Sequence, residues 1–151
     1  MIIIEDSRQK KGFHEIKHAK FQEYGDRLER YMLPFGDYAL PPRVSIDTKA
    51  NMGEIASNIG REHERFRREL IRAKRCKCHL YILIENDEDI CSIDDVRGWT
   101  NPRLIDYPDA ITGEHLAKAM ATMQDRYGCT FLFCTPEQSA GIIRHLLEQG
   151  V

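Results

Sequence analysis

The sequence lacks the features of membrane proteins and of secreted proteins held by disulfides. No apolar run approaches the roughly 20 residues of a membrane span, and residues 1–4 are too short for a signal peptide and lead directly into acids. The five cysteines are an odd number, which favours reduced thiols over a disulfide framework. We therefore expect a cytoplasmic protein with no membrane partner.

A zinc-finger ligand set is also missing. Cys76, Cys78 and His79 stand together, but no second ligand pair follows at zinc-finger spacing, and the segment leads into an apolar strand. We therefore predict buried free thiols and no zinc. His14 and His18 are four residues apart and share a face if residues 14–24 form a helix. With no third ligand evident, this pair favours a solvated helix surface over a metal site.

The chain has no overall positive charge that would mark a nucleic-acid binder, because its net charge is −2. The distribution of charge is more informative. Residues 61–77 carry eight Lys or Arg against three Glu, whereas residues 78–96 carry six acids and no Lys or Arg. This separation predicts one basic face on a mildly acidic protein. The acidic segment alone would suggest a protein-interaction role, but such runs are usually solvated surfaces.

Length and apolar patterning predict a single α/β domain over residues 1–151. Strands are expected at 2–4, 28–33, 44–47, 80–84 and 130–134, and helices at 14–24, 54–75, 113–127 and from 136 onward. Thr112 and Gly128 suit the two ends of the third helix, and Thr135 with Gln138 suits a capping box. The order is strand, helix, three-strand meander, long helix, strand, helix, strand, helix, which predicts a mixed sheet with helices on both faces.

Residues 36–49 are predicted to form a β-hairpin that carries two acids and a lysine. Asp37 lies in the turn before the hairpin, and Asp47 and Lys49 project from one face of its second strand. Carboxylate and carbonyl oxygens suit Mg²⁺, so Asp37, Asp47 and the Thr48 carbonyl are candidate metal ligands. Lys49 would position a nucleophile or stabilise negative charge in phosphodiester hydrolysis. The alternative is a turn residue beside an ordinary surface ion pair.

Two further acids are candidates for the same site. Asp6 ends the first strand, where it would serve as an outer acid or a second-metal ligand, or would only cap local backbone amides. Glu54 would belong to the site or would only begin the long helix, where its negative charge suits the helix dipole. The irregular segment 96–112 holds the only tryptophan and is a candidate functional loop.

Four arginines of the predicted helix 54–75 form a charged row that can follow a phosphate backbone. Arg61, Arg65, Arg68 and Arg72 follow one another at spacings of four, three and four. The alternatives are pairing with the glutamates of the same helix and burial in a dimer interface. If the row does not contact DNA, the next candidates are Arg97, Trp99 and Arg103.

These motifs together resemble the XPF-type branch of the PD-(D/E)XK nucleases over essentially the whole chain. The family's Asp-x-Arg-Glu appears as residues 6–9, with Gln9 in place of the glutamate, and its Gly-Asp appears as Gly36-Asp37. Asp47-Thr48-Lys49 stands where the family has Glu-Arg-Lys, and Gly53 stands where it has a further acid. Further matching segments are Gly60-Arg61, Leu83-Ile84-Glu85, residues 123–128 and residues 135–140.

The resemblance implies a restriction-endonuclease-like α/β/α sandwich with a central mixed β-sheet. It also implies Mg²⁺- or Mn²⁺-dependent cleavage of DNA at branched, flap or junction structures, in repair or recombination. Its site residues would be Asp37, Asp47, Lys49 and Asp6 for catalysis, and Arg8, Arg61, Arg65 and Arg68 for DNA binding. Many relatives dimerise through a tandem helix-hairpin-helix module that is not seen here, so we expect a compact stand-alone bacterial or phage enzyme and leave a homodimer open. The alternative is a catalytically inactive DNA-binding scaffold subunit.

Overall fold

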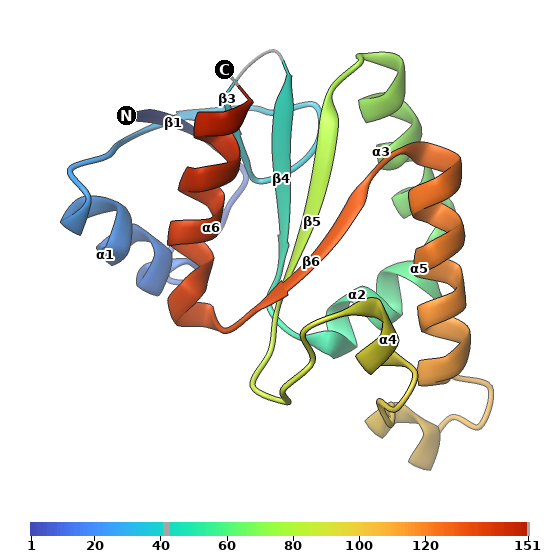
Figure 1. Cartoon of the computed structure of the whole chain (residues 1–151). Coiled ribbons are helices and arrows are strands. Elements are labelled where there is room, and N and C mark those ends of the chain that lie inside the picture. Colours follow the sequence, from blue (N-terminus) through green and yellow to red (C-terminus); the bar gives the residue numbers. More distant parts are fainter. Residues whose placement is uncertain (41–42, 151) are drawn as a thin grey trace.

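A computed structural model describes residues 1–40 and 43–150 and shows one mixed sheet with helices on both faces (Figure 1). The strands are β1 (Ile2–Asp6), β2 (Arg27–Tyr31), β3 (Tyr38–Leu40), β4 (Val44–Lys49), β5 (His79–Glu85) and β6 (Thr130–Cys134). Their order across the sheet is β2-β1-β3-β4-β5-β6. β3 is antiparallel to both of its neighbours, and all other pairs are parallel. The predicted α/β/α sandwich with a central mixed sheet is therefore confirmed.

Two layers of helices bury the two faces of the sheet in separate apolar clusters. One layer holds α1 (Glu15–Glu23) and α6 (Pro136–Gln149), and the other holds α2 (Met52–Ile59), α3 (His63–Arg75), α4 (Ile93–Val96), the 3₁₀ helix η1 (Pro102–Ile105) and α5 (Gly113–Tyr127). In β5, Ile82 belongs to the cluster beneath α2, α3 and α5, and Leu83 belongs to the cluster beneath α1 and α6. Both faces of this strand are buried, which explains its continuous apolar sequence.

Local capping signals predicted α5 and α6 closely. The Thr112 hydroxyl accepts a hydrogen bond from the amide of His115 at the start of α5, and Gly128 ends the helix with a φ of 69°. Thr135 and Gln138 form the expected capping box at the start of α6. Among the described residues, no helix is both long enough and apolar enough to cross a membrane.

The predicted single helix over residues 54–75 is wrong, because the chain breaks it at Gly60. α2 ends at Ile59, Gly60 adopts φ −79° and ψ −85°, and α3 begins at His63. A Cβ atom at position 60 would lie 2.9 Å from the Ala56 carbonyl oxygen, so glycine allows this tight break. The first of the two helices, α2, begins at Met52, two residues earlier than predicted, with Asn51 as its N-cap. As a result, Arg61 lies between two helices instead of continuing a row along one.

The predicted three-strand meander is also wrong. β2 pairs in parallel with β1, and β3 pairs with the other side of β1, so β2 and β3 are not neighbours. The reason is the crossover through α1, which returns the chain to the outer edge of β1. β1 is consequently second from the sheet edge. The hairpin of β3 and β4 is confirmed, and residues 41–42 within it lie outside the described residues.

Candidate active site

The hairpin holds Asp37 against the end of β4. The Asp37 carboxylate accepts hydrogen bonds from the Thr48 amide at 2.7 Å and the Thr48 hydroxyl at 2.6 Å, and also from the Gln9 side chain. The turn before Asp37 requires glycine, since Gly36 has a φ of 76° and a Cβ there would lie 2.3 Å from the Ser45 hydroxyl. Gln9 stands where the XPF-type family has a glutamate, and its side chain contacts Asp37 directly.

Asp47 and Lys49 form a buried pair beside Asp37. Lys49 Nζ lies 3.0 Å from Asp47 Oδ2, yet this oxygen has no hydrogen-bond partner among the residues that the structure describes. Burial by itself lowers the pKa of Lys49, but the Asp47 carboxylate outweighs it and leaves the pKa above its usual value. The lysine is therefore a cation at neutral pH and cannot serve as a general base. Its chemistry here is to stabilise negative charge.

Two acids share this buried site with a single lysine. Burial and the nearby charge of Asp47 together raise the pKa of Asp37 to about 8, against the opposing hydrogen bonds from Thr48. Buried carboxylate oxygens are the hard donors that suit Mg²⁺ or Mn²⁺, and Asp47 Oδ2 has only Lys49 beside it among the described residues. The residues present thus fit the metal that the resemblance implies. The Thr48 side chain holds Asp37, so only its backbone carbonyl is available as a ligand.

Glu69 of α3 joins this site, although the sequence suggested only that it pairs with arginines on a solvated surface. Its Oε1 accepts a hydrogen bond from the Gly36 amide at 3.1 Å. Burial and, to a smaller extent, the charge of Asp47 together raise the pKa of Glu69 to about 7. The sequence held a signal that could have found it. Glu69 follows the buried Phe66 by three positions and so shares its face of the helix, and the Phe66 ring centroid is 5.6 Å from Lys49 Nζ.

The raised pKa of Glu69 leads to a prediction for stability. The pKa in the folded protein is about 7 against an ordinary value of 4.5, so the folded state keeps a proton that the unfolded chain releases between these values. In EDTA, the free energy of unfolding should fall as pH rises through this window, by up to roughly 3 kcal/mol. Glu69→Gln keeps the acceptor for Gly36 and should flatten this fall. Urea unfolding at pH 5 and pH 8 measures it, with the exposed Glu64→Gln of the same helix as control. Equal pH dependence in wild type and Glu69→Gln would contradict the assignment.

Asp6 and Glu54 line the same cavity, but their carboxylates are occupied by local contacts. Asp6 accepts from the Leu33 amide at 3.1 Å and from Arg8 Nε at 2.9 Å, and Arg8 also donates to the Leu33 carbonyl. Glu54 accepts from the Ala50 amide at 2.7 Å in the first turn of α2. These contacts favour a structural role for both acids, in which Asp6 caps backbone amides and Glu54 begins the helix. They also show that Arg8 orders the strand end as well as facing the cavity.

The site lies in a cavity of about 910 Å³ that is lined by both acidic and cationic side chains. The cationic side chains that line it are Arg8, Lys10, Lys49, Arg61, Arg65, Arg72 and Arg103. Arg68, predicted to belong to the same row, does not line the cavity and is exposed on α3. Arg97 pairs with Asp94, and Trp99 is buried with its ring N–H bonded to Glu88. Of the loop residues proposed as substitutes, only Arg103 reaches the cavity.

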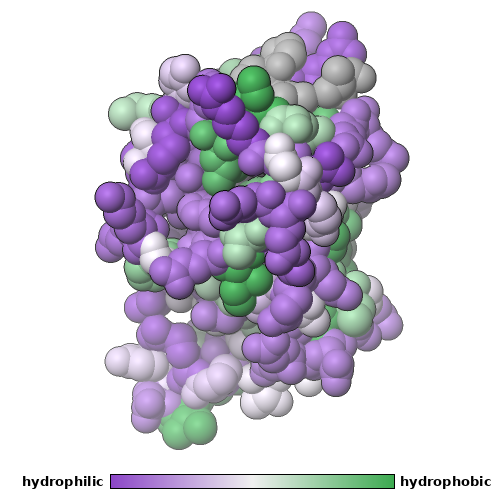
Figure 2. All heavy atoms as spheres, turned by 90° about the vertical axis from the view of Figure 1, so that its left-hand side faces the viewer, coloured by the Kyte–Doolittle hydropathy of each residue, from purple (hydrophilic) through white to green (hydrophobic). Residues whose placement is uncertain are grey.

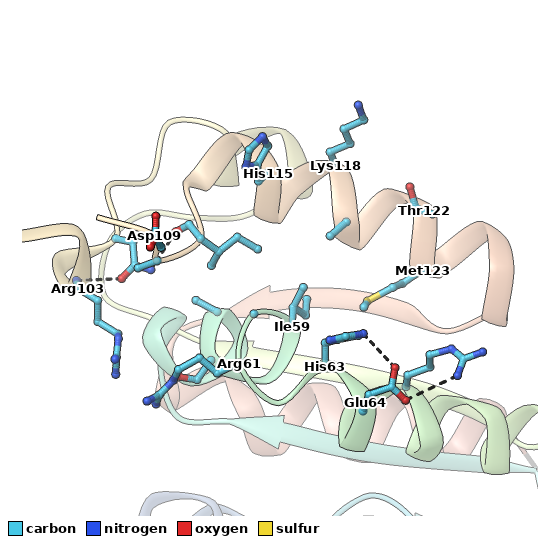
Figure 3. Close-up of a pocket in the computed structure, with 18 of the residues that line it drawn as sticks. Ile59, Arg61, His63, Glu64, Arg103, Asp109, His115, Lys118, Thr122 and Met123 are labelled. Carbon is cyan, nitrogen blue, oxygen red and sulfur yellow. Dashed lines mark hydrogen bonds and ion pairs between the residues drawn. The ribbon is translucent and has the colours of Figure 1, made fainter. Parts of the chain in front are cut away.

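A second groove of about 930 Å³ adjoins the first between α5 and the α2–α3 turn (Figure 3). Ile59 and Met123 lie between α5 and the α2–α3 segment in this view, and charged side chains surround them. The cationic and imidazole side chains that line it are Arg61, His63, Arg67, Arg103, His115, Lys118 and Arg126. Ser57, Arg61 and Arg103 line both hollows, so the groove continues from the candidate active site.

The cysteines contribute nothing to these sites. All five are free, and Cys76 is exposed, so the expectation of buried thiols is wrong for this residue. Burial raises the pKa of Cys78 to about 11, which keeps its thiol protonated at neutral pH.

Comparison with known proteins identifies the fold. No protein-family model matches the sequence, and no curated protein matches it significantly. The structure superposes on XPF from Aeropyrum pernix with a TM-score of 0.72 and 18% identity, covering 99% of this chain and 64% of that one. The chain has the XPF fold. A second structure, of the same XPF in complex with DNA, gives a TM-score of 0.71 at 17% identity, covering 98% of this chain and 64% of that one.

The likeness to XPF confirms the fold expected from the sequence motifs. At 17–18% identity it shows the fold alone, and this chain spans about 64% of the length of the XPF chains it matches. Function must therefore be argued from the site itself.

Proposed function

We propose that this protein is a divalent-metal-dependent DNA endonuclease with its active site in the cavity around Asp37, Asp47 and Lys49. The observation that carries the proposal is the buried group of Asp47, Lys49 and Asp37, in which Lys49 Nζ lies 3.0 Å from Asp47 Oδ2 and a second acid lies alongside. The arginines that line the cavity suit a polyanionic substrate. The structure of XPF in complex with DNA adds support from a protein of the same fold.

The chain's own residues divide the work of phosphodiester hydrolysis. Asp37, Asp47 and the Thr48 carbonyl would hold Mg²⁺ or Mn²⁺, which when bound lowers the pKa of its water and neutralises phosphate charge. Lys49 places a fixed cation where negative charge develops. The Thr48 hydroxyl and amide keep Asp37 oriented. Glu69 adds a further acid, and its pKa of about 7 means that it gains or loses a proton near neutral pH. The arginines of the rim would hold the DNA backbone.

The rival function is a catalytically inactive DNA-binding scaffold. A scaffold has no use for buried acids that repel phosphates. Burial and the charge of Asp47 raise the pKa of Asp37, so an ionised carboxylate at this position costs free energy. Residues arranged at such cost favour catalysis over binding alone.

Incubation with labelled DNA tests the proposed activity. Single-stranded, duplex, flap and four-way-junction substrates are compared with Mg²⁺ and with EDTA. We expect Mg²⁺-dependent cleavage, with flap or junction DNA cut faster than plain duplex. Cleavage in EDTA would reject the metal-dependent mechanism. No cleavage of any substrate by protein that binds DNA would reject the enzyme in favour of the scaffold.

Salt dependence of DNA affinity tests which arginines contact phosphates. Arg61, Arg65 and Arg72 line the cavity, so each Arg→Ala change should reduce the slope of log affinity against log salt by about one unit. Arg68→Ala is the matched control, because this exposed residue lies on α3 with Arg65 and Arg72 but lines neither the cavity nor the groove. Unchanged slopes in all three variants would exclude this surface as the DNA track.

A further inference from the structure

α1 is attached to the sheet mainly by polar side chains. Its buried residues are Lys17 and Phe21, whereas Ile16 is 48% exposed. Lys17 Nζ pairs with Glu85 at the end of β5. Figure 2 shows the side of the molecule that carries α1, where hydrophilic residues dominate and hydrophobic ones form separate small patches. A helix with so little apolar contact needs specific polar contacts to stay in place.

His14, the N-cap residue of α1, and His18 within α1 face a buried acid of β1. The Glu5 side chain is only 3% exposed, and its Oε1 lies 2.6 Å from His18 Nε2 and 4.0 Å from His14 Nδ1. One potential ligand atom from each residue lies within 4.8 Å of the other two. The sequence left the histidine pair without a third ligand, because Glu5 joins it only through the packing of α1 on β1.

We propose that Glu5, His14 and His18 form a binding site for one Zn²⁺-class transition-metal ion, separate from the active site. Ligands at 2.0–2.1 Å from a tetrahedral ion lie roughly 3.3 Å apart, and the observed 2.6 and 4.0 Å bracket this separation. Two imidazoles and one carboxylate suit zinc, whereas the acids around Asp47 suit Mg²⁺. Histidines one helical turn apart present both rings to one ion, and water completes the coordination.

The surroundings prepare these ligands. Arg30 Nε lies 3.4 Å from Glu5 Oε2, which fixes the carboxylate and leaves Oε1 toward the histidines. The Tyr38 hydroxyl hydrogen-bonds to both His14 Nδ1 and Glu5 Oε1, so it holds these two atoms together and a bound ion would take its place. Burial lowers the pKa of His14 to about 4, so its ring is neutral and carries a lone pair at neutral pH.

The position of the site assigns it a structural role. Glu5 and Asp6 are consecutive in β1, so their side chains leave opposite faces of the sheet, and the active-site cavity is lined by Asp6 and not Glu5. A metal held by Glu5 and both histidines would fasten α1 to β1. Because it binds only the folded chain, a hundredfold excess over the dissociation constant should raise the melting temperature by roughly 8 °C.

Cobalt and zinc titration of the whole chain tests the proposal without any activity assay. The protein carries Asp47→Asn to weaken the active-site metal site, and Co²⁺ absorption and calorimetry with Zn²⁺ report binding. We expect one ion per chain with visible cobalt bands but no thiolate charge-transfer band, because the ligands are nitrogen and oxygen. His18→Ala should weaken binding at least roughly 100-fold. Its side chain is 42% exposed, so the change should leave folding intact.

A matched variant and a second ligand variant complete the test. His145→Ala removes an exposed histidine of α6 and should change neither affinity nor the melting shift. His14→Ala should weaken binding like His18→Ala. The proposal is overturned by absence of stoichiometric binding, by equal affinity in both histidine variants and the parent, or by a thiolate band that places the ion at the cysteines.

Discussion

Asp47→Asn is expected to lower DNA cleavage by at least about 10³-fold while leaving the fold intact, since a bound metal supplies several kcal/mol of charge stabilisation. Asp47 Oδ2 lies 3.0 Å from Lys49 Nζ, and asparagine keeps an oxygen that can face the lysine, so the change removes the charge with little change of shape. DNA binding without metal should survive or tighten, because one acid fewer faces the phosphates. Calorimetry with Mn²⁺, beside a single-turnover cleavage assay, measures both effects.

Asp37→Asn should be equally inactive but should also alter the hairpin. Its carboxylate accepts three hydrogen bonds, two of them from Thr48 and one from Gln9. An amide can serve Thr48 through its oxygen if Gln9 turns its own amide around. The exposed Asp125→Asn of α5 is the control and should retain full activity. Unchanged Mn²⁺ affinity in both active-site variants would show that these acids are not the ligands.

Lys49→Met should lower kcat by about 10²–10³-fold with Mn²⁺ affinity largely retained, which is the scale of losing one electrostatic stabiliser. Methionine is preferred to alanine as the primary change because it fills the space beside Phe66 and so limits repacking. Asp47 holds the pKa of Lys49 above its usual value, so the lysine is charged throughout the neutral range. The loss should therefore be constant between pH 6 and pH 9.

Lys49→Arg separates charge from geometry in the same experiment. The guanidinium keeps the positive charge but is larger than the ammonium, so partial activity between wild type and Lys49→Met is expected. Lys49→Ala should follow Lys49→Met in kcat. A fully active Lys49→Ala protein would return Lys49 and Asp47 to an ordinary ion pair without a catalytic role.

Much of this protein follows from short-range sequence signals. Thr112, Gly128 and Thr135 act within a few residues of the helix ends they define, so the bounds of α5 were predictable. Alternation along a strand likewise placed Asp47 and Lys49 on one face of β4, where their charged groups lie 3.0 Å apart. Such signals are local, and they do not depend on which other element packs nearby.

Tertiary structure decided the contacts between elements that local patterns leave undetermined. The stripe through Phe66 indicates which face of α3 is buried, but only packing against the hairpin brings Glu69 to the Gly36 amide. The same is true of Glu5, which reaches His14 and His18 because α1 crosses over β1. Apolar periodicity in the sequence shows which face of a helix or strand is buried, but not which element packs against it. The contacts of Glu69 and Glu5 depend on that packing element, so only the tertiary structure could reveal them.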